Sequence, residues 1–159
     1  MTRILVLLIA LTSTVVAAGW TAFRSSTLGF SVQHPSGWRV VARDAQVTFE
    51  AIRGEQTLAS FAVNVYPAQS LDAWVRSRRA TETLPDGSSR VERVRDARLG
   101  TRATKQIVLF AFDRSVLEEA VVVGKRLYVI SFDDDNPNDP QFKAHKAMYQ
   151  QMRSSLRFP

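Results

Sequence analysis

Apolar and polar residues alternate with a period of two along much of the chain after residue 19, which is the pattern of half-buried β-strands. Phe30, Val32 and His34 share one face of such a run, and polar side chains lie between them. Clusters of Pro, Gly, Asp and Ser separate the runs, as expected of turns. The pattern predicts strands at 30–34, 38–41, 47–51, 59–67, 103–112, 116–123 and 127–132. Most connections are short, which favours antiparallel pairing.

One strand and one turn give more specific predictions. Residues 103–112 become apolar on both faces towards their end, which predicts a central strand that is covered on each side. Gly124-Lys125-Arg126 separates the last two strands and indicates a hairpin.

Two other segments have helical spacing. Ser70 is a candidate N-cap before Leu71, Trp74 and Val75, which predicts a helix over 70–84. A second helix begins near Asp139 and Pro140, and its apolar face follows at steps of three and four residues: Phe142, His145, Tyr149, Met152 and Leu156. The predicted fold class is α+β. We expect an αβα sandwich with a central, mainly antiparallel sheet of about seven strands, one inserted helix and one C-terminal helix.

Residues 1–18 have a different pattern, with Arg3, an unbroken apolar stretch over 4–11 and small residues up to Ala18. This arrangement predicts a cleavable signal peptide, cut before Gly19, and an exported protein that is periplasmic or secreted. The alternative is a membrane anchor, but three hydroxyl residues interrupt the segment near its middle, and a span needs about 20 apolar residues. We therefore expect no transmembrane anchor after cleavage.

Composition fits a single exported domain over residues 19–159. Of the 159 residues, 45% are hydrophobic, which excludes an intrinsically disordered chain. The absence of cysteine excludes a disulfide scaffold, a cysteine nucleophile and a thioether-linked lipoprotein. Cleavage would leave 141 residues, enough to bury roughly two-thirds of the surface without disulfides.

One segment carries a family resemblance. Residues 29–38, Gly-Phe-Ser-Val-Gln-His-Pro-Ser-Gly-Trp, resemble the GFSI-x-YP-x-GW opening of the PsbP-like superfamily, and the layout is similar over residues 22–158. That superfamily includes extrinsic photosystem proteins, a nuclear Ran-binding protein and small exported bacterial proteins. His34 departs from the pattern, where tyrosine is common. The resemblance implies an αβα sandwich and, for bacterial members, an exported, non-enzymatic accessory role. It implies neither a photosystem function nor a manganese, calcium or chloride site.

Catalytic motifs are absent from the sequence, so we expect no enzymatic activity. His34 and His145 are the only histidines and have no HExxH spacing, which excludes a dedicated zinc centre. Ser31 lacks the second glycine of a nucleophile elbow, and there is no glycine-rich phosphate loop.

The segment 133–139 is the most distinctive cluster, because its carboxylates and amides are ligand types that calcium accepts. Its candidate metal ligands are Asp133, Asp135, Asn138 and Asp139. The spacing fails as an EF-hand, and a solvated turn is the simpler interpretation. We predict no cofactor. A divalent-cation-binding or enzymatic module that uses this loop and His145 stays open as an alternative.

Charge is unevenly distributed. Lys and Arg number 21 against 15 Asp and Glu, a net charge of +6. Residues 72–102 and 140–159 are basic, whereas residues 113–139 are acidic. Solvated faces explain such runs in most proteins. The functional interpretation is a docking face for an envelope protein, with candidate contact residues Arg76, Arg78, Arg79, Arg93 and Arg95.

We therefore expect an exported accessory or binding protein of the bacterial cell envelope that acts by protein–protein contact. Peripheral binding to an anionic envelope surface is a further alternative. Nucleic acid is disfavoured as a partner by export and by the absence of suitable aromatic groups.

Overall fold

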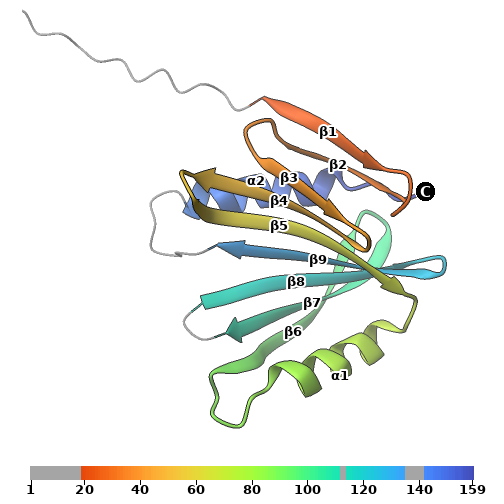
Figure 1. Cartoon of the computed structure of the whole chain (residues 1–159). Coiled ribbons are helices and arrows are strands. Elements are labelled where there is room, and N and C mark those ends of the chain that lie inside the picture. The colour runs from red at the N-terminus through yellow and green to blue at the C-terminus, as the bar shows by residue number, and fades with distance from the viewer. Residues whose placement is uncertain (1–18, 112–113, 135–141) are drawn as a thin grey trace, which may run out of the picture.

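The computed structural model describes residues 19–111, 114–134 and 142–159 (Figure 1). These residues form nine strands and two helices. In chain order the elements are β1 (Trp20–Ser25), β2 (Phe30–Pro35), β3 (Arg39–Arg43), β4 (Gln46–Arg53), β5 (Gln56–Pro67), α1 (Leu71–Glu82), β6 (Ser89–Leu99), β7 (Arg102–Ala111), β8 (Arg114–Val123), β9 (Arg126–Asp134) and α2 (Phe142–Ser155).

The strands form two antiparallel sheets. The larger sheet has seven strands in the order β3-β4-β5-β9-β8-β7-β6, so β9 lies in the middle and β6 at one edge. Strands β1 and β2 form a separate two-stranded ribbon. The ribbon is joined to the segment after α2, because the backbone amides and carbonyls of Ser31 and Arg157 exchange hydrogen bonds of 3.0 and 2.9 Å.

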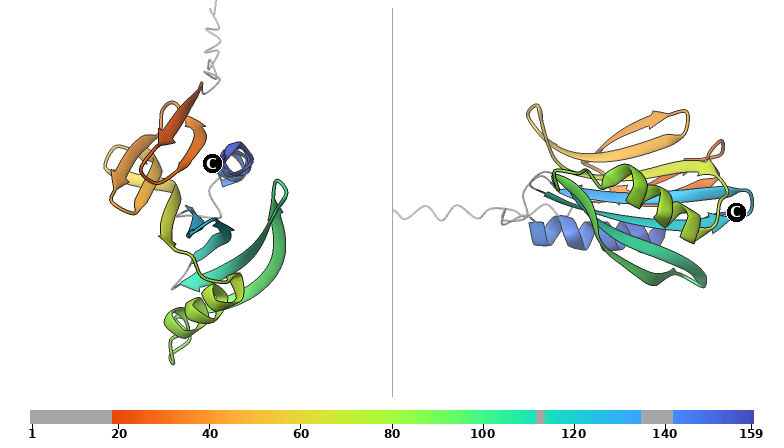
Figure 2. Two further views of the ribbon diagram at one scale, coloured as in Figure 1. Left: turned by 90° about the vertical axis from the view of Figure 1, so that its right-hand side faces the viewer. Right: turned by 90° about the horizontal axis from the view of Figure 1, so that it is seen from below.

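Both faces of the seven-stranded sheet are covered, as the alternation in β9 shows. Tyr128 and Ile130 belong to the larger core, together with α2 and the ribbon. Leu127 and Val129 point to the opposite face and pack in the smaller core with α1. Figure 2 shows α1 and α2 on different sides of the curved sheet. The predicted α+β sandwich is confirmed.

The helix predictions agree with the structure. The hydroxyl oxygen of Ser70 accepts a hydrogen bond from the backbone N–H of Ala73 at 3.1 Å, which caps α1, and Trp74 is buried beneath it. On α2, Tyr149 and Met152 are buried, as the spacing predicts. The predicted start at Asp139 and Pro140 lies outside the described residues. In the part of the chain that is described, neither helix is long and apolar enough to cross a bilayer.

The strand predictions need corrections in number and in placement. The sequence missed β1 and β6, and the predicted strand 30–34 is β2, which belongs to the ribbon rather than to the main sheet. Strand β6 was missed because a bulge between Val91 and Arg93 breaks the period of two: Val91 and Val94 are three residues apart yet pack in the same core. The predicted central strand 103–112 is β7, which lies beside the edge strand, and β9 is central instead.

Candidate functional site

A groove lies beside α2, on the sheet face opposite α1. Figure 2 shows that the sheet curves around α2, so that the hairpin of β6 and β7 rises beside the helix. The groove has a volume of about 290 Å³. We call it the α2 groove, and its lining residues are Arg93, Arg95, Val108, Ser115, Leu117, Phe132, Asp134, Lys146, Tyr149 and Gln150.

The floor of the α2 groove is a row of side chains across four strands. Arg93 on β6 lies opposite Val108 on β7, Val108 opposite Leu117 on β8, and Leu117 opposite Phe132 on β9. Directly opposite residues project from the same face of a sheet. The floor is therefore apolar near the middle of the sheet and cationic at the edge.

Cations reach the α2 groove from two elements. Arg93 and Arg95 come from β6, and Lys146 comes from α2. The Nε of Arg95 donates a hydrogen bond of 2.7 Å to Oε1 of buried Gln106, which fixes the guanidinium beside the sheet. Asp134 is the one carboxylate among the described lining residues. The excess of positive charge favours an anion in the groove.

Tyr149 lines the α2 groove and carries a buried hydroxyl. The residue is 1% exposed, its ring stacks on Phe132 with centroids 4.8 Å apart, and its hydroxyl has no hydrogen-bond partner among the described residues. Burial raises the pKa of the phenol, and the negative charge of Glu119 raises it further. The hydroxyl is thus a neutral donor. A buried polar group without a partner costs about 1–3 kcal/mol, so a ligand or water that accepts this hydrogen bond is favoured.

The inner end of the α2 groove contains a buried carboxylate–imidazole pair. The Nδ1 of His145 lies 2.9 Å from Oδ2 of Asp134, and the two side chains are 9% and 4% exposed. His145 packs edge-on against Trp38 and lines a second cavity of about 280 Å³ with it. Asp134 therefore lines the α2 groove, and its partner His145 lines the second cavity.

A second buried ion pair holds α2 on the sheet. Glu119 on β8 is fully buried, and its Oε1 accepts hydrogen bonds from Nη2 of Arg153 at 2.7 Å and from Oγ1 of Thr104 at 2.6 Å. The same Nη2 donates to the carbonyl of Arg98 on β6 at 2.6 Å. The bonds of Arg153 tie α2 to β8 and β6, and the bond of Thr104 joins β7 to the same carboxylate, so one wall of the α2 groove is fixed relative to its floor.

The predicted partner-binding arginines do not form one surface. Arg93 and Arg95 line the α2 groove, whereas Arg76 and Arg79 are exposed on α1, on the other side of the sheet. Arg78 donates to both oxygens of Glu118 at 2.6 and 2.9 Å, and also pairs with Glu82. It therefore anchors α1 to β8. Burial still raises the pKa of Glu118, against the opposing effect of the Arg78 charge.

The predicted metal ligands are only partly within the described residues. Asp133 and Asp134 are the last residues of β9 and belong to the strand, not to the turn that the sequence indicated. Asp133 pairs with Arg114 at 3.2 Å. Asp135, Asn138 and Asp139 lie outside the described residues. Within those residues no group of three or more His, Asp or Glu side chains could hold a metal ion.

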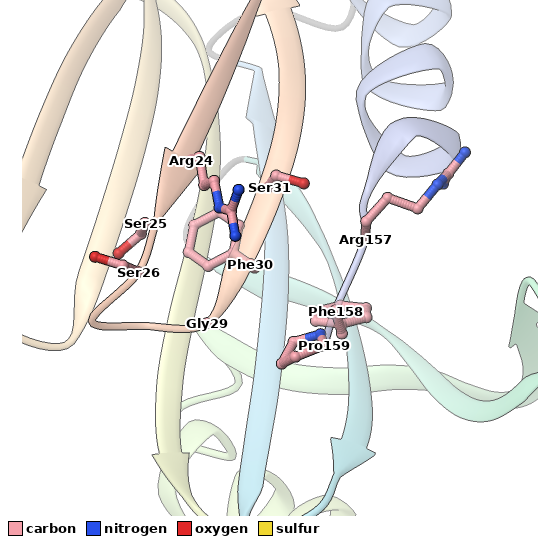
Figure 3. Close-up of a pocket in the computed structure, with 9 residues that line it drawn as sticks. All are labelled: Arg24, Ser25, Ser26, Gly29, Phe30, Ser31, Arg157, Phe158 and Pro159. Carbon is pink, nitrogen blue, oxygen red and sulfur yellow. The ribbon is translucent and has the colours of Figure 1, made fainter.

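A further hollow of about 370 Å³ lies between the turn of the β1–β2 ribbon and the last residues of the chain. Figure 3 shows that Arg157 turns its guanidinium towards α2 and away from Phe158 and Pro159. Its Nη1 donates to the carbonyl of Ser154 at 2.8 Å. Arg24 and Arg157 are the cations among its described lining residues, and none of these residues has a buried donor without a partner, in contrast to the three cations and the Tyr149 hydroxyl at the α2 groove.

Sequence reasoning found Arg93 and Arg95 but missed Lys146, Tyr149 and Gln150. Lys146 was visible only as part of the basic segment 140–159, and Tyr149 only as a core position of the helix. Their role in the groove depends on the strand order, for which the sequence carries no local signal.

Comparisons with known proteins define the fold. No protein-family model and no curated protein matches the sequence. The class is an antiparallel α+β sandwich. Within it the chain has a PsbP-like fold, because it superposes on the solution structure of cyanobacterial PsbP (CyanoP) from Synechocystis sp. PCC 6803 with a TM-score of 0.63, covering 93% of this chain and 97% of that chain. The sequence identity is 12%, so the likeness concerns the fold alone.

A crystal structure from Bacteroides thetaiotaomicron VPI-5482 is also similar, with a TM-score of 0.47 and 10% identity. It covers 87% of this chain and 48% of that chain. A likeness at this level adds nothing about function.

Proposed function

We propose that the protein is an exported, non-catalytic accessory protein of the bacterial cell envelope and acts by contact with an acidic region of a partner protein. Residues 1–18 are the export signal and residues 19–159 the single domain in this proposal. The observation that carries it is the convergence of Arg93, Arg95 and Lys146 on the α2 groove. The PsbP-like fold supports an accessory role through the resemblance of residues 29–38 to that superfamily.

Two positive charges at the α2 groove are not neutralised by a described acidic side chain. Neither Arg93 nor Lys146 has an acidic partner among the described residues, and both are exposed. Cations in a concave site with an apolar floor attract an anionic partner more strongly than cations on a flat surface, because the low-dielectric walls focus the field. A partner carboxylate is therefore the expected counter-ion.

Charge reversal tests the proposal. The exported protein is crosslinked in its native envelope and captured, with the variant Arg93→Glu/Arg95→Glu compared against Arg76→Glu/Arg79→Glu, which carries the same charge change on α1. Loss of the captured partner in the groove variant alone is the expected result. Retention of the partner in both variants, with both folded by circular dichroism, would contradict the proposal.

A second candidate function is a divalent-cation site at the end of β9. The Asp134–His145 contact of 2.9 Å favours it, since it places a carboxylate and an imidazole at the start of the segment 135–139. Calorimetry with calcium on the exported protein and on Asp135→Asn/Asp139→Asn tests this function. The cation site is ruled out if millimolar calcium gives no heat of binding, or if it gives the same heat in both proteins.

A further inference from the structure

The partner group that fits the α2 groove has a specific chemistry. We infer that the groove binds the C-terminal residue of a polypeptide, taking its carboxylate at Arg93, Arg95 and Lys146 and its apolar side chain on the floor. The inference rests on the proposed function, because it names the part of the partner that makes the contact.

The groove combines positive charge with an apolar surface over a short distance. Arg93 lies directly opposite Val108 in the sheet, and Val108 directly opposite Leu117. Arg93 and the two apolar residues therefore belong to one continuous lining, and a ligand that covers it carries both an anionic and an apolar group. An internal Asp or Glu side chain offers a carboxylate without an apolar body. A terminal residue carries its carboxylate and an apolar side chain on the same Cα.

The size of the cavity agrees with a chain end as its ligand. The cavity of about 290 Å³ is near the lower limit of small-ligand sites, about 300 Å³, and accommodates a chain end rather than a folded surface. The lining carries three cations against the carboxylate of Asp134, so inorganic phosphate is included in the test below as a competing anion.

The hydroxyl of Tyr149 supplies the independent observation. It is a buried donor without a partner among the described residues, Tyr149 itself lines the groove, and the positive charge of Arg95 acts on the phenol. Because the oxygen is closed to solvent, a carboxylate held by Arg95 accepts its hydrogen bond only after a small shift of the surrounding side chains, and the bond then removes the cost of leaving the donor unpaired. A partner that contacted only the rim of the groove would leave the hydroxyl of Tyr149 without a hydrogen-bond acceptor.

Calorimetry with short peptides tests the inference on the purified exported protein. The probe is acetyl-Gly-Ser-Gly-Leu with a free carboxylate. Its comparison compounds are the same peptide as a C-terminal amide, acetyl-Gly-Glu-Gly-amide, 4-methylpentanoate and inorganic phosphate. We expect the free-carboxylate peptide to bind about 10-fold more tightly than its amide, the factor for one hydrogen bond to a charged group. Binding should weaken at high salt, because exposed cations contribute.

Variants locate the site. Arg93→Gln/Arg95→Gln should abolish peptide binding, and Tyr149→Phe should weaken it about 10-fold, the factor for one hydrogen bond to a charged group. Arg76→Gln/Arg79→Gln on α1 is the matched control and should leave the affinity unchanged. Tyr149→Phe removes a hydroxyl that bonds to nothing in the described structure, so this variant keeps the test valid if the arginine variant folds poorly.

Several results would overturn the inference. One is that the amide binds as tightly as the free-carboxylate peptide, and another is that millimolar peptide does not bind. The inference also fails if Arg93→Gln/Arg95→Gln binds the peptide as tightly as the unchanged protein, or if 4-methylpentanoate or phosphate binds as tightly as the peptide. If acetyl-Gly-Glu-Gly-amide alone binds and the captured partner still depends on Arg93 and Arg95, the proposed contact stands and the C-terminal inference fails. If neither the peptides nor the captured partner depends on these arginines, both fail.

Discussion

Arg153→Met tests how α2 is held on the sheet. The guanidinium of Arg153 bonds both oxygens of Glu119, a side chain with 0% exposure, and also the carbonyl of Arg98. The hydrogen bond to Glu119 raises the pKa of Arg153, as expected of a guanidinium whose charge is stabilised. Methionine keeps an unbranched stem of similar length but removes every donor. Among the described residues, only the hydroxyl of Thr104 would then bond the buried carboxylate.

The expected loss of stability is large. Removing one member of a buried ion pair costs about 3–5 kcal/mol, because the other charge stays buried without its counter-ion. For a domain of this size, about 4 °C of melting temperature corresponds to 1 kcal/mol, which predicts a decrease of about 12–20 °C. Total stability of such domains is about 5–15 kcal/mol, so the variant is expected to fold but with a small margin.

Urea and thermal unfolding, followed by circular dichroism, measure the loss. The double variant Glu119→Met/Arg153→Met is the control: it removes both charges, and we expect it to be more stable than Arg153→Met alone, with a coupling energy of at least about 2 kcal/mol. The reasoning is wrong if Arg153→Met costs less than about 1 kcal/mol, or if the two single substitutions add without coupling.

Three further predictions concern other parts of the chain. Burial raises the pKa of Glu118, so the folded protein retains this proton to a higher pH than the unfolded chain. The free energy of unfolding should therefore fall as the pH rises above the usual carboxyl pKa of 4.5, and it should fall less steeply in Glu118→Gln. Urea titrations at several pH values measure this, and the same pH dependence in both proteins would contradict it. Ser70→Ala should destabilise the protein by about 1 kcal/mol through loss of the α1 cap, whereas Ser70→Asp should not; chemical denaturation measures both. N-terminal sequencing of the exported protein should begin at Gly19, and a membrane-bound product that retains residues 1–18 would show that the segment is an anchor.

Local signals in the sequence predicted the elements that depend on local structure. Gly124 has a φ of 57°, in the left-handed region that favours glycine, and the hairpin between β8 and β9 was predicted from it and Lys125. The cap at Ser70 and the buried face of α2 were predicted from their spacing. Strand β6 was not, because its bulge changes the phase of the alternation without a local marker.

The candidate site could be predicted only in part, because it depends on pairing between distant strands. Phe61 on β5 lies opposite Phe132 on β9, and this pairing places β9 at the centre of the sheet. The order of the remaining strands then brings β6 to the edge beside α2. A change of one residue in register would move Arg93 to the α1 face, and no residue in the sequence specifies that register by itself.

The uneven charge of the sequence has a structural explanation in the ion pairs. The acidic segment 113–139 contributes Glu118 to Arg78 of one basic segment and Glu119 to Arg153 of the other. Both pairs are partly or fully buried and connect a helix to β8, so these acids and arginines stabilise the fold. The exposed arginines do not take part in these two pairs. On β6 they lie beside a groove with an apolar floor and a buried donor, which is why we assign the partner contact there rather than to α1.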